Sequence, residues 1–204
     1  MENKILSLKN LSKSYGEKTL FSSLSADLEF GKTYALTAKN GRGKTTLFKI
    51  ILGLISPDNG EVLLDGEALS PCDCGIAFQE HRLFSHLSAI DNVTIVGGDA
   101  ENARNLLSYF GFSDADMKKK PRALSGGMKQ AVSISRAIAS NRKILLLDEA
   151  SKELDKEVKS RLYQKLTELK KDKLIIMITH DSEDVAFCDE EISLDNFTSL
   201  QQIK

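Results

Sequence analysis

Tryptophan is absent from the 204-residue sequence, and proline and cysteine occur only three times each. No apolar run reaches the roughly 18 residues that a membrane-spanning helix needs, and the opening segment MENKILSLKN lacks the apolar stretch of a secretory signal. An odd number of cysteines fits a reducing compartment better than a disulfide framework. Cys72 and Cys74 have no second ligand pair at metal-binding spacing, so we expect incidental thiols in a cytoplasmic chain.

The charges are nearly balanced, with 28 Lys and Arg against 29 Asp and Glu and a formal net charge of −1. No global basic field is therefore available to recruit nucleic acid or an anionic membrane surface, and we expect no nucleic-acid partner. A composition that is 41% hydrophobic and 28% charged is that of an ordinary globular protein and excludes a disordered or fibrous chain. The length favours a single unit that spans residues 1–204.

The first part of the chain, residues 1–78, is predicted to be rich in strands. Apolar and polar residues alternate between Ile5 and Phe30, which predicts antiparallel strands joined by a turn at 14–18. Residues 34–37 form a short apolar strand before a glycine-rich loop. A helix is predicted next, because four apolar residues recur at helical spacing: Leu47, Ile50, Ile51 and Leu54.

Helical periodicity then dominates from residue 79 to about 140, which predicts an inserted helical region. After it, residues 143–147 read as a buried strand, 154–169 as an amphipathic helix and 174–179 as another buried strand. Strands that alternate with helices predict a parallel sheet and an α/β fold.

A phosphate-binding loop is predicted between the strand at 34–37 and the helix that follows. Gly41 and Gly43 allow the backbone to curl so that its N–H groups face an anion, which the positive end of the helix dipole also favours. Lys44 adds a full positive charge, and the hydroxyl of Thr45 is placed to bind Mg²⁺. The loop consists of Ala38, Lys39, Asn40, Gly41, Arg42, Gly43, Lys44, Thr45 and Thr46. The full motif has glycine where Ala38 stands, and alanine is tolerated there if its φ is negative.

Two carboxylates, Asp148 and Glu149, follow four apolar residues of the buried strand predicted at 143–147. Residues at the carboxyl end of such a strand lie where α/β folds bind their ligands. Asp148 is suited to hold Mg²⁺, and Glu149 to orient and deprotonate a water molecule aimed at a phosphate. Considered alone, the pair could also be two solvated acids at the end of a strand.

A second candidate anion site lies at Ser125, Gly126 and Gly127, where small residues open a helix. Taken alone, this segment reads as a simple helix cap. Taken with the phosphate-binding loop and the two carboxylates, it resembles the signature sequence of ATP-binding-cassette (ABC) ATPases, and the resemblance covers essentially the whole chain.

This resemblance implies roles for further residues. Tyr15 is similar to the aromatic residue that stacks on adenine, Gln79 to the glutamine that senses Mg²⁺ and the attacking water, and His180 to the switch histidine that contacts the γ-phosphate. Residues 151–155, which end at Asp155, resemble the D-loop that crosses to a second subunit. Residues 80–93 resemble the corresponding stretch of importer subunits for nitrate, sulfonate and related anions.

The resemblance also implies the fold: a P-loop NTPase with a mixed-sheet core, an N-terminal antiparallel β subdomain and an inserted α-helical subdomain. Residues 1–78 and 141–204 would form the nucleotide-binding core with its β subdomain, and residues 79–140 the helical signature subdomain. The implied ligands are ATP and Mg²⁺, with Thr45, Gln79 and Asp148 around the metal. Glu149, His180, Gln79 and Lys44 are the implied catalytic residues.

The implied assembly is a head-to-tail dimer, which we expect to be a homodimer, with each ATP held between the phosphate loop of one subunit and the signature of the other. The expected function is to power a separate transmembrane permease from the cytoplasmic face of the membrane. A soluble ABC ATPase, for example of the iron–sulfur assembly type, is the main alternative. A regulatory module that holds ATP without cleaving it is disfavoured by Glu149 and His180. Ala150 replaces the usual proline after Glu149, which predicts a less rigid loop toward Asp155.

Overall fold

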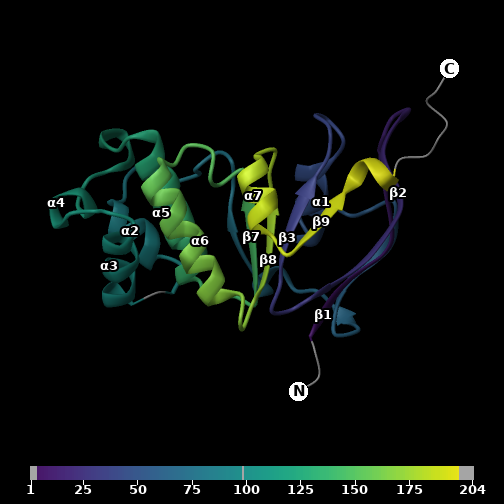
Figure 1. The fold of residues 1–204 in the computed structure, drawn as a ribbon, viewed down its shortest axis with the longest axis horizontal. Coiled ribbons are helices and arrows are strands. Elements are labelled where there is room, and N and C mark those ends of the chain that lie inside the picture. The colour runs from purple at the N-terminus through teal and green to yellow at the C-terminus, as the bar shows by residue number, and fades with distance from the viewer. Residues whose placement is uncertain (1–3, 98, 198–204) are drawn as a thin grey trace.

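The computed structural model describes residues 4–97 and 99–197, and Figure 1 shows their arrangement. At one end of the molecule lies a four-stranded antiparallel sheet with the order β2-β1-β4-β5. Its strands are β1 (Ile5–Tyr15), β2 (Lys18–Glu29), β4 (Asn59–Leu64) and β5 (Glu67–Ala68). The antiparallel strands predicted near the N-terminus are thus confirmed, and the turn lies between Tyr15 and Lys18.

A five-stranded sheet with the order β6-β7-β8-β3-β9 fills the centre of the molecule. All of its neighbouring strands pair in parallel, as the alternation of strands and helices predicted. The strands are β3 (Thr33–Thr37), β6 (Cys74–Ala77), β7 (Ile144–Asp148), β8 (Leu174–Ile178) and β9 (Glu190–Ser193). The antiparallel and the parallel strands therefore belong to two separate sheets, and the expectation of a mixed sheet in the core is wrong. Short turns join the antiparallel strands within one sheet, whereas parallel strands need longer crossover connections and collect in the other.

Strands β7 and β8 are buried along their whole length because both faces of the parallel sheet are covered. Leu145 and Leu147 point into one hydrophobic core, shared with the helical region. Ile144 and Leu146 point into a second core, shared with the antiparallel sheet and α1 (Lys44–Ile51). The alternation of strand side chains between two faces explains why these segments read as continuous apolar runs.

The helical region lies at the other end of the molecule, opposite the antiparallel sheet (Figure 1). It contains α2 (Ala89–Thr94), α3 (Ala100–Tyr109), α4 (Asp114–Met117) and α5 (Gly126–Ala139), with a short 3₁₀ turn, η2 (Pro121–Ala123). The prediction of helix from residue 79 onward is wrong for residues 79–88, which form turns and irregular backbone, because the capping box of Ser88 and Asp91 begins α2 only there.

The remaining elements are η1 (Pro71–Asp73), α6 (Lys156–Leu169), α7 (Ser182–Phe187) and η3 (Leu194–Phe197). Helix α1 ends at Ile51, earlier than its apolar spacing suggested, because Gly53 turns the chain at a φ of 66°. Leu54 is consequently 60% exposed and does not join the apolar face of that helix.

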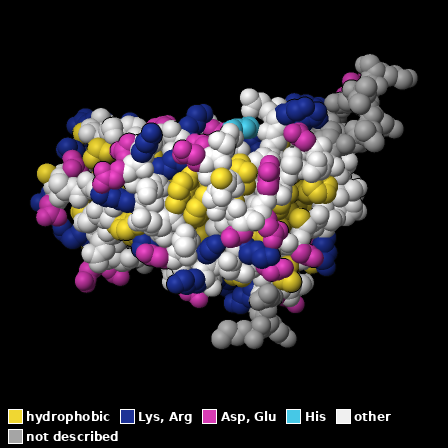
Figure 2. All heavy atoms as spheres, in the orientation of Figure 1, with side chains coloured by type: hydrophobic (Ala, Val, Ile, Leu, Met, Phe, Trp, Pro, Cys, Tyr) yellow, Lys and Arg dark blue, Asp and Glu magenta, His cyan; other side chains and the backbone are white. Residues whose placement is uncertain are grey.

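The longest helices, α5 and α6, have 14 residues each. Among residues 4–97 and 99–197, no helix combines the length and the apolar character that a membrane crossing requires. Acidic and basic side chains are interspersed over the face that Figure 2 shows, in agreement with the balanced charge of the sequence.

The parallel pairing gives the sheet its functional edge. Strands β3, β6, β7 and β8 run in the same direction, so the segments that follow their carboxyl ends meet along one edge of the sheet. Four predicted features follow these ends: the phosphate-binding loop after β3, Gln79 after β6, the two carboxylates at the end of β7, and His180 after β8.

The contact between β6 and α5 depends on the missing side chain of Gly75. A Cβ atom at this position would lie 2.6 Å from the backbone oxygen of Ala137. We predict that Gly75→Ala lowers the free energy of unfolding by about 1–3 kcal/mol, measured by urea denaturation, because the strand and the helix must move apart. The control is Gly16→Ala, where φ is 58° but no atom lies within 4 Å. A cost no greater than that of the control would contradict this prediction.

Candidate functional site

The loop after β3 is folded around the ammonium group of Lys44. Gly41 and Gly43 adopt φ values of 74° and 96°, which side chains other than glycine rarely adopt. The Nζ atom of Lys44 donates a hydrogen bond of 2.8 Å to the carbonyl oxygen of Ala38. Desolvation lowers the pKa of Lys44, while the negative charges of Glu149 and Asp148 oppose that shift. The backbone of Ala38 lies outside the positive-φ region, so alanine is accommodated there as predicted.

The same loop leads into α1, and among the residues that the structure describes no side chain caps this helix. The first N–H groups of a helix lack intrahelical partners, so they are available to an anion. This end of the helix borders a cavity of about 380 Å³. The cavity is lined by the predicted loop residues from Asn40 to Thr46 together with Tyr15, Asp148, Glu149 and His180.

The outer side of the loop is held by Asp195, a residue that the sequence reading missed. Its carboxylate accepts a hydrogen bond of 3.2 Å from the backbone N–H of Lys39 and lies 3.8 Å from Nε of Arg42. Asp195 lies in η3, so only the fold brings it to the loop. It thereby places a negative charge beside Lys39 and Arg42 of the loop.

Asp148 ends β7 with a side chain that is almost entirely buried, since the residue is 4% exposed. Desolvation, together with the adjacent charge of Glu149, raises the pKa of Asp148 to about 6, although Lys44 acts in the opposite direction. This carboxylate is therefore ionised at neutral pH but destabilised by its surroundings, and a cation beside it would relieve that penalty.

Glu149 lies at the centre of the polar contacts in the site. Its φ of 47° is unusual for a residue with a side chain, and its N–H donates a 2.9 Å hydrogen bond to Ile178 of β8. The carboxylate accepts a 3.2 Å hydrogen bond from Nε2 of Gln79 and a 3.1 Å one from Nζ of Lys152, and Nε2 of His180 lies 3.7 Å away. The resemblance assigned Gln79 and His180 to the same site as Glu149 but did not predict their contacts with it, and the contact of Lys152 was not foreseen.

Tyr15 lies at the rim of the same cavity, with 55% of its surface exposed. The ammonium group of Lys13 is 5.5 Å from the centre of its ring, within the range of a cation–π contact. An exposed aromatic face beside a phosphate-binding loop is suited to stack on a planar ring.

The signature residues lie apart from this cavity. Ser125 and Gly127 face a second cavity, of about 580 Å³, together with Asp155. The Oγ atom of Ser125 accepts a 3.2 Å hydrogen bond from the N–H of Met128 and so caps α5, whose first helical residue is Gly126. Asp155 likewise caps α6. Within one chain, the two predicted anion sites therefore do not meet.

The donor set fits Mg²⁺. Thr45 and Asp148 both line the cavity of the phosphate-binding loop, and a hydroxyl with a single carboxylate is a typical protein contribution to a magnesium ion that also binds phosphate oxygens and water. In the part of the chain that the structure describes, no three His, Cys, Asp or Glu side chains form a cluster that could hold a metal ion by themselves.

The family model described as ABC transporter matches residues 21–152, which include the phosphate-binding loop, the signature and the two carboxylates. The chain belongs to the ABC transporter family. Its fold is accordingly that of a P-loop NTPase of the ABC cassette type, as the sequence predicted.

Curated ABC relatives extend over the full length of the chain. The spermidine/putrescine import ATP-binding protein PotA of Mesoplasma florum is 30% identical over 100% of this chain and 62% of its own length. The sulfate/thiosulfate import ATP-binding protein CysA of Pseudomonas syringae pv. tomato is 30% identical over 97% of this chain and 66% of its own length. The chain thus spans less than two thirds of the PotA and CysA proteins that it matches.

Solved ABC cassettes share the arrangement of elements. The cassette MJ0796, in a dimeric post-hydrolysis state bound to ADP and Pi, superposes with a TM-score of 0.84 at 27% identity and covers 92% of this chain and 93% of its own. CbiO1 from Clostridium perfringens, part of the ABC transporter complex cbiONQ, superposes with a TM-score of 0.78 at 26% identity, covering 94% and 85%.

The burial of Asp148 leads to a prediction on stability. We expect Asp148→Asn to raise the free energy of unfolding at pH 7, without nucleotide or metal, by on the order of 1–3 kcal/mol, because a desolvated charge is removed. Because the pKa is raised only in the folded chain, the penalty is full above about pH 6 and shrinks as the pH falls toward the ordinary aspartate pKa of about 4, below which the carboxyl group is protonated in the folded and the unfolded chain alike. Thermal unfolding at pH 7 and pH 5 measures it. An Asn variant that is less stable than the wild type at pH 7 would contradict the assignment.

Proposed function

We propose that this chain binds and hydrolyses ATP and acts as the ATP-binding subunit of an ABC transporter. The observation that carries the proposal is that one cavity collects the phosphate-binding loop with Lys44, the carboxylates of Asp148 and Glu149, and His180. The ADP and Pi in the cassette MJ0796 and the naming of PotA and CysA as import ATP-binding proteins support it.

The phosphates of ATP would bind at the N-terminus of α1 and to Lys44, with the adenine ring against Tyr15. The remaining loop residues, from Ala38 to Thr46, would supply backbone N–H groups and positive charge. Thr45, Asp148 and Gln79 would hold Mg²⁺, which when bound neutralises charge on the phosphate oxygens. The raised pKa of Asp148 favours this role, because binding a cation offsets the desolvation of its carboxylate.

Glu149 would act as the general base. Its carboxylate lies where Gln79 and His180 also converge, so these three side chains can orient a water molecule and accept its proton. Lys44 and His180 would stabilise the charge that develops on the γ-phosphate. Gln79 and Lys152 both contact the Oε2 atom of Glu149, which leaves Oε1, on the side of His180, to accept the proton.

The separation of the two cavities supports a dimer. Ser125, Gly126, Gly127 and Asp155 would contact the ATP bound to a second copy of the chain, packed head to tail. Dimeric solved cassettes support this arrangement. Such a dimer would act on a separate transmembrane permease and would lie peripherally on the cytoplasmic face of the membrane. The naming of PotA and CysA as import ATP-binding proteins supports the role in transport.

Replacement of the proposed base tests the ATPase assignment. We expect Glu149→Gln to reduce ATP turnover by about 100-fold or more while nucleotide binding persists, because the amide cannot accept the proton from water. Phosphate release and fluorescent-nucleotide binding measure the two effects. Glu190→Gln is the matched control, because Glu190 pairs with Lys32 at the opposite end of β3. Turnover unchanged by Glu149→Gln would exclude the proposed mechanism.

The transport assignment has its own test. We expect the tagged chain, purified gently from native membranes, to bring a multi-spanning membrane protein with it in a fixed ratio, measured by mass spectrometry. Recovery from the soluble fraction alone, with ATPase activity but no membrane protein, would favour the alternative of a soluble ABC ATPase.

A further inference from the structure

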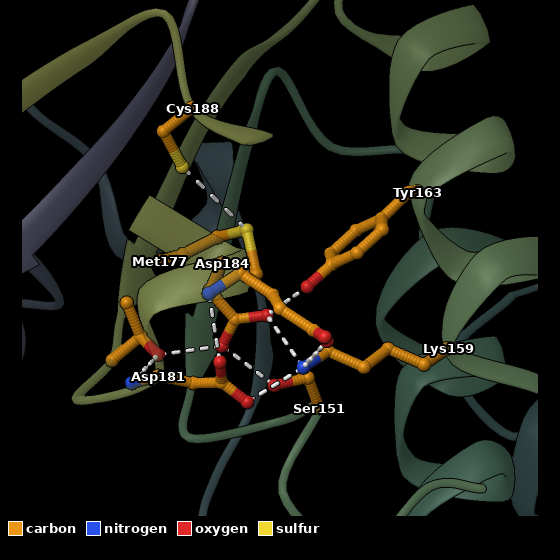
Figure 3. Close-up of polar contacts among 9 residues, drawn as sticks. Ser151, Lys159, Tyr163, Met177, Asp181, Asp184 and Cys188 are labelled. Carbon is orange, nitrogen blue, oxygen red and sulfur yellow. Dashed lines mark hydrogen bonds and ion pairs between the residues drawn. The ribbon is translucent and has the colours of Figure 1, made fainter. Parts of the chain in front are cut away.

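A buried carboxylate beside the proposed site joins the two loops that carry Glu149 and His180. Asp184 lies in α7 and is 1% exposed. It accepts three short hydrogen bonds from hydroxyl groups: 2.6 Å from Ser151, 2.5 Å from Thr179 and 2.5 Å from Tyr163 (Figure 3). Asp184 is not among the residues that line the cavity of the phosphate-binding loop, so it does not serve as a ligand there.

The three hydroxyl donors come from separate parts of the chain. Ser151 is two residues after Glu149, in the loop between β7 and α6, and Thr179 immediately precedes His180 after β8. Tyr163 lies in α6 and anchors the carboxylate to that helix. Ser151 and Thr179 both donate to the Oδ2 atom of Asp184, so one oxygen atom joins the two loops.

The residue after His180 is held by the same group of side chains. The Nζ atom of Lys159, in α6, lies 2.6 Å from the carboxylate of Asp181 and 3.9 Å from that of Asp184 (Figure 3). The hydrogen bond from Lys159 lowers the pKa of Asp181. The N–H of Asp181 in turn donates a 3.0 Å bond to the hydroxyl of Thr179. His180 therefore stands between two residues that are both fixed.

This arrangement is specific to a carboxylate. A buried charge is destabilising unless hydrogen bonds and an opposite charge compensate it. Here three hydroxyls do so, and Lys159 adds a smaller share because its ammonium group lies closer to Asp181 and Glu183. Each hydroxyl must point its proton at the carboxylate, which defines the orientation of both loops. A neutral residue of similar size could not accept from all three donors as strongly.

We propose that Asp184 is a positioning residue that holds the loop of Glu149 in register with the loop of His180, and thereby supports ATP hydrolysis. The inference rests on the proposed function for its kinetic consequence. The separation that Asp184 maintains is the 3.7 Å between Nε2 of His180 and Oε1 of Glu149. Asp184 acts through Ser151 and Thr179, without contact to the reacting groups.

Steady-state kinetics of the full-length chain test this role. We expect Asp184→Ala to lower kcat for ATP about tenfold or more while KM changes less than threefold, because the phosphate-binding loop does not depend on Asp184. Asp184→Asn is expected to retain more activity than the alanine variant, since its amide oxygen still accepts hydrogen bonds. It also serves as the test variant if alanine prevents folding. Equal kcat in wild type and in both variants would overturn the proposal.

A matched control separates positioning from general stability. Asp189 accepts 2.7 Å hydrogen bonds from the N–H and the hydroxyl of Thr33 at the start of β3, at the end of the sheet away from the site. Asp189→Asn should lower the thermal midpoint yet leave kcat within twofold of wild type. A kcat loss in Asp189→Asn as large as in Asp184→Asn, at equal destabilisation, would overturn the positioning role.

Removal of the hydroxyls tests the route of the effect. In a chain that already carries Ser151→Ala and Thr179→Val, Asp184→Asn should lower kcat by less than twofold further, because its two links to the loops are gone. A further loss as large as in the wild-type background would show that Asp184 acts by another route and would overturn the proposal.

Hydrogen–deuterium exchange gives a readout that does not require hydrolysis. Without nucleotide, Asp184→Ala and Asp184→Asn should increase exchange in both segments 149–155 and 179–183, whereas Asp189→Asn should change neither. Unchanged exchange in both segments overturns the coupling of the loops. If the wild-type chain proves unable to hydrolyse ATP, the proposed function and the kinetic role fall together, while the exchange result still decides whether Asp184 joins the loops.

Discussion

The burial of β7 and β8 between two hydrophobic cores is the constraint on which the site depends. Because every residue of both strands is buried, their direction and register are fixed by packing on two faces. The first polar residues after such strands must emerge at one edge of the sheet. Asp148 pairs with Ile178 in register, so Glu149 and His180 follow from neighbouring strands and reach the same cavity.

Electrostatics in this edge is a balance of desolvated groups. Desolvation raises the pKa of Asp148 and lowers the pKa of Lys44. The opposite charges of the two groups partly counteract both shifts. Glu149 is bound by Gln79 and Lys152 in place of solvent. A bound divalent cation would offset the desolvation of Asp148, and a bound phosphate would offset that of Lys44. The proposed substrate, ATP with Mg²⁺, supplies both.

Much of the fold and of the site could be predicted because short contiguous motifs carry them. The phosphate-binding loop, the strand that ends at Asp148 and the helix that opens at Gly126 each combine periodicity with a local chemical requirement. The same reasoning failed at Leu54, where a glycine turn ends a helix that the apolar spacing would continue. The helix prediction for residues 79–88 was wrong because irregular backbone imposes no periodicity on the sequence.

Two of the residues that sequence reading missed, Asp195 and Asp184, act over long separations in the chain. Asp195 contacts Lys39 where the neighbouring strands β9 and β3 end, and Asp184 in α7 contacts Ser151 in the loop after β7. An isolated aspartate in a short helix has no local pattern that would distinguish it from a solvated acid. The replacement of proline by Ala150 was expected to loosen the following loop, and this stays a prediction; the hydrogen bond from Ser151 to Asp184 links that loop to α7.

The hydrogen bond between Lys44 and the carbonyl oxygen of Ala38 has a consequence for the thermodynamics of ligand capture. A free lysine side chain loses conformational entropy when it binds an anion, but the side chain of Lys44 is already confined by its hydrogen bond to the loop. An ammonium group has three protons, so Lys44 can keep its bond to Ala38 and still offer two to a phosphate. The Lys44 ammonium group is thus ordered during folding, so the proposed nucleotide would meet a binding group that is already in place.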